Sequence, residues 1–91
     1  MNATDRAAEI GAEDGRKAAE TWWANTVRVR DPEITKQLLI DRLKVGRWDF
    51  DAPEPDPIAT MNRGYSIEQW DAYEAAYRAA VEETIREAVK S

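Results

Sequence analysis

The candidate partner-binding segment of this chain is the stretch RWDFDAPEPDP, residues 47–57. Its first half alternates aromatic and acidic residues, and its second half alternates proline and acidic residues. Displayed to solvent, such a strip offers rings and carboxylates to a protein partner, and its negative charge speeds their encounter. In one version of this hypothesis the acids imitate a nucleic acid. The side chains assigned to the partner are Trp48, Asp49, Phe50, Asp51, Glu54 and Asp56.

The same stretch can instead be a strap that holds two helices together. In an extended backbone, Trp48 and Phe50 lie on one side and Asp49 and Asp51 lie on the other. The rings would then pack on the preceding helix, and the prolines would carry a stiff, extended chain to the next one. The sequence favours the strap and leaves both interpretations open.

Catalytic and metal chemistry has little support in this sequence. The chain has no cysteine and no histidine, which excludes thiolate zinc sites, a cysteine nucleophile and the commonest general base. The segment DFDAPEPD (49–56) lacks the central glycine and the spaced glutamate of a calcium loop. Glu74, at the edge of an apolar stripe, is expected to pair with Arg78 rather than act as an acid. We therefore expect no enzyme activity, no metal and no cofactor.

Length and charge set the broad class. A chain of 91 residues fits one domain, 1–91, and its 18 acids and 13 bases give a net charge of −5. No apolar run approaches the roughly 18–20 residues of a membrane span, and the N-terminus is too polar for a signal peptide. A cytoplasmic location is expected.

A DNA-binding module is the alternative function, because the basic residues concentrate between positions 28 and 47. The attraction to phosphate that supplies most DNA affinity is nevertheless opposed by the overall charge. In a helix-turn-helix arrangement, Asp31 and Glu33 would also lie at the end that faces the bases. The basic side chains concerned are Arg28, Arg30, Lys36, Arg42, Lys44 and Arg47.

The apolar pattern predicts an all-α domain of three helices, at about 4–25, 32–45 and 67–89, with a long loop rich in aromatics and proline before the last. Ser66 and Gln69 form a capping box at the start of the third helix, and Tyr65 with Trp70 fits a hydrophobic staple. The inward stripe of that helix is Trp70, Tyr73, Tyr77, Ala80, Val81, Thr84, Ile85 and Ala88.

The first helix has an inward stripe of small residues that ends in two tryptophans. Each glycine inside a helix costs about 1 kcal/mol relative to alanine, so Gly11 and Gly15 require a compensating contact. We expect that contact to be close packing against the third helix, whose alanines between positions 72 and 80 are small enough to allow it.

The second helix, bounded by the Asp31–Pro32 cap and Gly46, is apolar on more than one side. Its apolar residues Leu39, Ile40 and Leu43 are expected to lie only partly beneath the strap. An uncovered apolar patch usually marks an interface, and a two-fold homodimer is its commonest form. A monomer in which the strap covers the patch is the other expectation.

Two segments, GAEDGRKAAETWW (11–23) and WDAYEAAYRAAVEE (70–83), resemble small uncharacterised proteins of actinobacterial or archaeal phages and plasmids. The resemblance implies a mobile-element origin and assigns no activity and no functional residue. Together with the acidic strip, it leads to the expectation of a small acidic protein-binding module that modulates a host protein.

Overall fold

Two long helices, α1 (Ala3–Val29) and α4 (Ile67–Lys90), form the main axis of the computed structural model, which describes residues 2–29, 31–44 and 52–90. A shorter helix, α2 (Pro32–Lys44), follows α1, and a short helix, α3 (Pro57–Met61), precedes α4. The described ranges contain no strand. The predicted all-α fold with three main helices is confirmed, and α3 is an additional turn within the predicted loop. No helix of these ranges is both long enough and apolar enough to cross a membrane.

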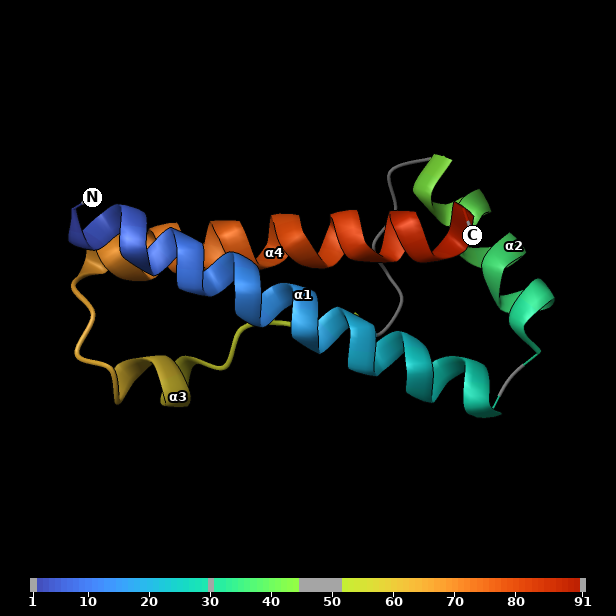
Figure 1. Ribbon diagram of the computed structural model, residues 1–91, viewed down its shortest axis with the longest axis horizontal. Helices are drawn as coiled ribbons and strands as arrows, with labels where there is room; N and C mark the ends of the chain where they lie inside the picture. Colours follow the sequence, from blue (N-terminus) through green and yellow to red (C-terminus); the bar gives the residue numbers. More distant parts are fainter. Residues whose placement is uncertain (1, 30, 45–51, 91) are drawn as a thin grey trace.

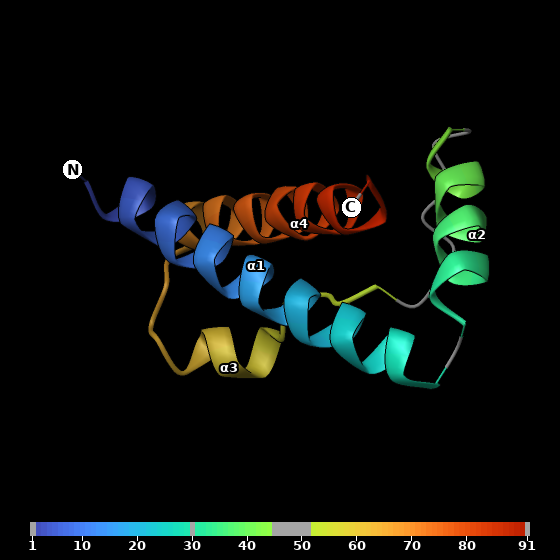
Figure 2. The ribbon, with the colours of Figure 1, turned by 45° about the vertical axis from the view of Figure 1, so that its right-hand side comes forward.

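The helices α1 and α4 lie side by side and run in the same direction (Figures 1 and 2). Their contact is made through the two glycines of α1. A Cβ atom on Gly11 would lie 3.0 Å from Tyr73 Cα, and one on Gly15 would lie 3.0 Å from Tyr77 Cα; each would lie closer still to the carbonyl oxygen of that tyrosine. The expected close packing is therefore present, and it lies against the tyrosine backbone rather than against alanine side chains.

The core consists of two rows of side chains with a spacing of four residues. One row lies on α1, and the other lies on α4. This spacing is typical of helices that pack with their i, i+4 ridges interdigitated. The C-terminal ends of α1 and α4 diverge in Figure 1. Trp22 and Trp23, near the C-terminal end of α1, pack against the core. The two rows are Ala7, Gly11, Gly15 and Ala19 on α1 and Tyr73, Tyr77, Val81, Ile85 and Val89 on α4, and Leu39 of α2 joins the same core.

Side-chain caps define the helix starts. The Asn2 carboxamide accepts a hydrogen bond from Asp5 N (2.8 Å), and the Asp31 carboxylate accepts one from Glu33 N (2.9 Å). The capping box of α4 is present in both directions, with Ser66 N donating to Gln69 Oε1 (2.8 Å) and Gln69 N donating to Ser66 Oγ (3.2 Å). These local signals were sufficient to predict where α2 and α4 begin.

The helix α1 ends at Val29, four residues beyond its predicted end at Asn25. The β-branched residues after Asn25 are weak helix formers, but Thr26 donates its hydroxyl to the carbonyl oxygen of Trp22 (2.7 Å) within the helix. Arg28 lies in the last turn, where a positive charge interacts favourably with the helix dipole. The tryptophans one turn earlier pack against the core and hold this part of α1 in place.

The helix α2 crosses the far end of the pair, near the C-terminus of α4 (Figure 2). Its inward face is formed by Leu39, which is only 5% exposed, and by Thr35, whose hydroxyl donates to the carbonyl oxygen of Asp31 (2.8 Å). Ile34 and Leu38 are 63% and 52% exposed. The expectation that Leu39 is available to a second copy is therefore wrong, because this side of α2 packs on its own core.

Candidate protein-binding groove

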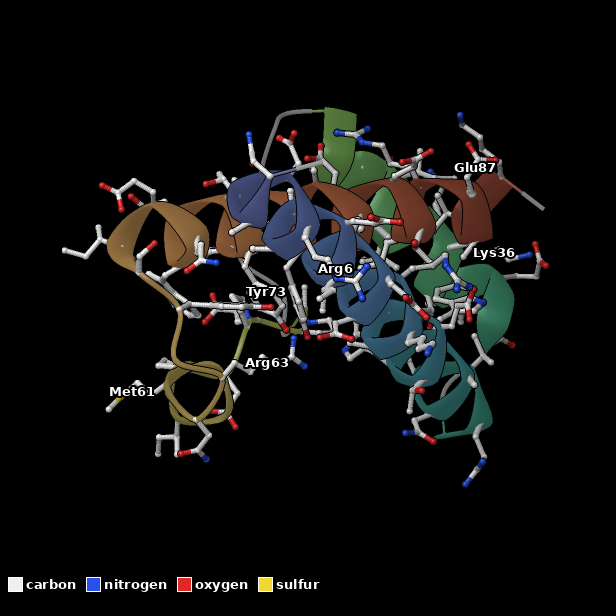
Figure 3. All side chains as sticks on the ribbon, turned by 60° about the vertical axis from the view of Figure 1, so that its left-hand side comes forward. Arg6, Lys36, Met61, Arg63, Tyr73 and Glu87 are labelled. Atoms are coloured by element: carbon white, nitrogen blue, oxygen red, sulfur yellow. The ribbon has the colours of Figure 1, made fainter. Side chains whose placement is uncertain are left out.

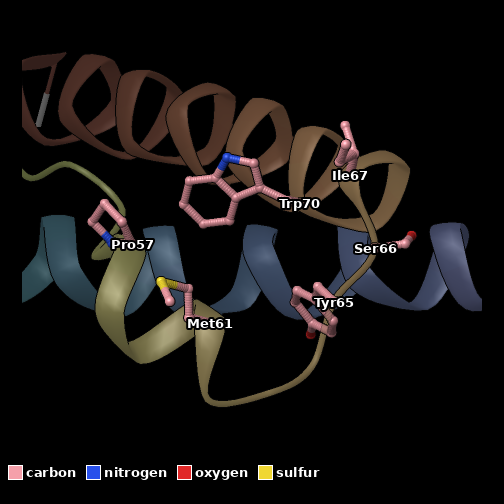
Figure 4. A pocket seen from close by; sticks show the side chains of 6 residues that line it. All are labelled: Pro57, Met61, Tyr65, Ser66, Ile67 and Trp70. Carbon is pink, nitrogen blue, oxygen red and sulfur yellow. The ribbon is translucent and has the colours of Figure 1, made fainter.

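An apolar groove lies between α3 and the first turn of α4, with a volume of about 440 Å³. Figure 4 shows the indole of Trp70 reaching from α4 toward α3, with the side chains of Pro57 and Met61 beside it. The lining residues carry no charged side chain, and their polar side-chain groups are the hydroxyls of Ser66 and Tyr65 and the indole N–H of Trp70. The groove is lined by Pro57, Met61, Tyr65, Ser66, Ile67 and Trp70.

Large apolar side chains at this groove face solvent. Met61 and Ile67 are each 77% exposed, and Ile58 on α3 is 71% exposed. Met61 projects outward from α3 in Figure 3. Groups this open cannot enclose a small molecule, which typically loses most of its surface to its pocket. The folded surface of another protein, which is rigid and covers a wider area than a small molecule, fits the groove better.

Packed aromatic rings support the floor of the groove. The ring of Trp70 stacks on Tyr73 with centroids 6.1 Å apart and planes at 19°. The rings of Tyr65 and Tyr77 also pack against the Tyr73 ring, with centroid distances of 5.8 Å and 6.0 Å. Because Tyr73 is buried between α1 and α4, the groove rests directly on the core.

A polar cluster of Asp14, Arg63 and Tyr73 ties the loop between α3 and α4 to α1. Figure 3 labels Arg63 and Tyr73 of this cluster. Tyr73 donates its hydroxyl to Asp14 Oδ2 at 2.7 Å, and Arg63 donates to the same oxygen at 3.1 Å. The guanidinium of Arg63 also lies 5.3 Å from the centre of the Tyr73 ring, within range of a cation–π interaction. The cluster satisfies the buried hydroxyl and fixes the loop that carries Tyr65.

Burial raises the pKa of Tyr73 well above its usual value of 10, and the hydrogen bond to the Asp14 carboxylate raises it further. Burial likewise raises the pKa of Tyr77, and the charge of Asp14 adds to the effect. The pKa of Arg63 is raised chiefly by its hydrogen bond to Tyr65. Both buried tyrosines are therefore held in their neutral form.

These shifts predict a loss of stability at alkaline pH. Below about pH 10 both tyrosines are neutral in the folded and the unfolded chain, so their contribution is constant. Above that pH the unfolded chain releases protons that the folded chain retains, and the free energy of unfolding falls. Urea unfolding at pH 8 and pH 10.5 should therefore show a lower midpoint at the higher pH.

The control for this prediction is the double variant Tyr73→Phe/Tyr77→Phe, which has no buried phenol to ionise. All other side chains are the same in both proteins, so the difference between them isolates the two rings. The loss between pH 8 and pH 10.5 should be smaller in the double variant. An equal loss in both proteins would contradict the assignment.

The structure describes two of the six residues assigned to a partner from the sequence. Glu54 and Asp56 are exposed, and Asp56 Oδ1 accepts a hydrogen bond from Ile58 N (3.0 Å) at the start of α3. Pro55 between them is buried, and Ala52 packs against the core. This part of the segment therefore has the packing expected of a strap, with its acids outward. Trp48, Asp49, Phe50 and Asp51 lie outside the described residues.

The proposed dimer and DNA interfaces are described in part. Ile40 is partly buried against the core, and the side chain of Leu43 is outside the described part. Arg28 is exposed on α1. Homodimerisation and DNA binding stay predictions. The structure does not describe the side chains of four further basic residues of the proposed DNA interface, Arg30, Arg42, Lys44 and Arg47.

Sequence reasoning missed the groove and the polar cluster beneath it. Tyr65 and Trp70 were recognised as a staple, which places two groove residues together. Asp14, however, precedes Tyr73 by 59 positions and Arg63 by 49, and no periodic pattern connects residues so far apart. One signal was available, because Ile58, Met61 and Ile67 are large apolar residues outside the predicted stripes.

Comparisons with protein-family models, with curated proteins and with solved structures each found no match. The resemblance to small phage and plasmid proteins therefore stays a prediction.

Proposed function

We propose that this chain is a protein-binding module whose contact surface is the groove between α3 and α4. The observation that supports it is the exposure of Ile58, Met61 and Ile67 around an apolar groove. Clustered large apolar side chains of this kind are typical of interaction sites in soluble proteins. If the resemblance to phage and plasmid proteins holds, the partner is a host protein.

The groove has the features of a binding surface supported from below. Tyr65 and Trp70 rest on the buried ring of Tyr73, so a partner meets a floor that needs little reordering on binding. Met61 is flexible and polarisable, which suits contact with apolar side chains of varied shape. The groove therefore combines a rigid aromatic base with an adaptable rim.

The variant Met61→Glu tests this proposal. It places a charge at the rim of the groove, so binding should fall by tenfold or more, while stability stays within about 0.5 kcal/mol because the site is exposed. The measurement is affinity capture from an extract of the natural host with immobilised wild-type and variant proteins, followed by titration of the retained partner.

The matched control is Ile34→Glu, which puts the same charge on an exposed apolar residue of α2, away from the groove. A partner retained by wild-type and Ile34→Glu, and lost by Met61→Glu, supports the groove. Loss with Ile34→Glu alone would place the interface on α2 instead.

A further inference from the structure

We propose that the groove binds a cationic amphipathic helix of the partner protein, with its apolar side against Met61 and Trp70 and its lysines or arginines against acids at the rim. This inference rests on the proposed function and specifies the chemistry of the partner.

The surroundings of the groove are strongly acidic. Residues 54–74 contain five acids and one base, so they hold a net charge of −4 in a chain of −5. The base is Arg63, and its guanidinium is held by Asp14 at 3.1 Å and lies over the Tyr73 ring. Arg63 is therefore engaged on the core side and does little to offset the acids.

Three of these acids are exposed and form no ion pair among the described residues. They are Glu54, before α3, and Glu68 and Asp71, in the first turns of α4. Glu74, one turn further along α4, already pairs with Arg78. Carboxylates on both sides of an apolar groove are complementary to positive charges on both edges of an apolar strip.

The positions of the acids fit such a strip. Asp71 lies one helical turn after Ile67, a lining residue, and therefore on the same side of α4. Glu68 follows Ile67 directly. Glu54 is exposed and lies three residues before Pro57, the lining residue at the start of α3. A helix bound in the groove would therefore lie near carboxylates of α4 and of the segment that leads into α3.

The walls of the groove favour a helical occupant. The lining residues Pro57 and Met61 are one turn apart on α3, as Ile67 and Trp70 are on α4, so both walls are helix ridges, which interdigitate with the ridges of a third helix. An added strand would need an open sheet edge, and the described residues form no sheet. Proline-rich peptides bind grooves lined by exposed aromatic rings. The ring of Tyr65 instead packs against Tyr73, so the groove is less suited to such a peptide.

The experiment titrates the full-length, ¹⁵N-labelled chain with synthetic 18-residue helices that share one leucine face and carry lysine, glutamine or glutamate on the other. A proline-rich peptide with arginines is the fourth probe. We expect the lysine helix to shift the amides of residues 57–71 and the Trp70 indole, and to bind at least fivefold more tightly than the glutamine helix. Its affinity should fall with added salt.

The variant Glu68→Gln/Asp71→Asn should weaken the lysine helix by about fivefold and leave the glutamine helix unchanged. The matched control Glu9→Gln/Glu83→Gln removes the same charge from exposed sites outside the groove and should leave both affinities unchanged.

The outcomes separate this inference from the proposed function. Equal binding of the lysine and glutamine helices at the groove would overturn the charge preference and leave a protein-binding groove. Groove binding by the proline-rich peptide alone would overturn the helical occupant. If none of the four probes shifts the groove, both this inference and the assignment of the groove as the contact surface are contradicted.

Discussion

Replacing Gly15 by leucine should lower the free energy of unfolding by about 1–3 kcal/mol. The backbone of α1 passes so close to Tyr77 that even a Cβ atom at Gly15 would lie 3.0 Å from Tyr77 Cα and nearer to its carbonyl oxygen. Backbone atoms cannot turn aside as a flexible side chain does. The added side chain must push α1 away from α4, and this separation loosens the contacts on both sides of it. Thermal and urea unfolding measure the loss.

The smaller change Gly15→Ala makes the test sharper, because its two effects have opposite signs. Alanine favours the helix by about 1 kcal/mol over glycine, so an open site would become more stable. We expect a net loss instead. The variant Ala24→Gly, at an exposed site of the same helix, measures the intrinsic difference between the two residues. A gain at Gly15 equal to the loss at Ala24 would show that α1 and α4 are not in close contact there.

The parts of the fold that the sequence predicted are those set by neighbours in the chain. The caps at Asp31 and Ser66 depend on residues two or three positions away, and the stripe of α4 depends on its own periodicity. Glycine is unfavourable inside a helix, so Gly11 and Gly15 of α1 predicted a close contact with another helix that compensates for this cost. Local physical chemistry was sufficient for these elements.

The orientation of α2 needed information from the rest of the fold. Because its apolar residues surround much of the helix, several faces were equally suited to the core. The face of α2 that is buried depends on how α2 packs against the diverging end of the α1–α4 pair. Leu39 is buried there, and Ile34 and Leu38 stay exposed. The sequence therefore predicted that part of α2 is uncovered and wrongly included Leu39 in that part.

The groove could not be predicted from the sequence for a related reason. A short helix such as α3, with the sequence PIATM, is below the length at which a periodic pattern can be recognised. The position of α3 depends on the loop that follows it, and that loop is attached through Arg63 to a residue of α1. Predicting the site therefore required a contact between segments that are far apart in the chain.

Removing the carboxylate by Asp14→Ala should lower the free energy of unfolding by about 1–3 kcal/mol. Asp14 accepts hydrogen bonds from both Tyr73 and Arg63 through one oxygen atom. Without it, the hydroxyl of the buried Tyr73 loses its acceptor, and Arg63 loses the partner that holds the loop to α1. The matched control is Glu13→Ala, which removes an exposed carboxylate paired with Lys17 on the same helix and should change stability by less than about 0.5 kcal/mol.

A double-mutant cycle with Tyr73→Phe isolates the hydrogen bond between Asp14 and Tyr73. Because the two groups are in direct contact, their effects should not add, and the interaction energy should reach about 0.5–1.5 kcal/mol. The groove supplies a second readout. Since Arg63 anchors the loop that carries Tyr65, Asp14→Ala should also shift the Trp70 indole resonance and weaken binding of the lysine helix, whereas Glu13→Ala should do neither. Equal stabilities of the Asp14 and Glu13 variants, with an unchanged groove in both, would show that the cluster does not support the site.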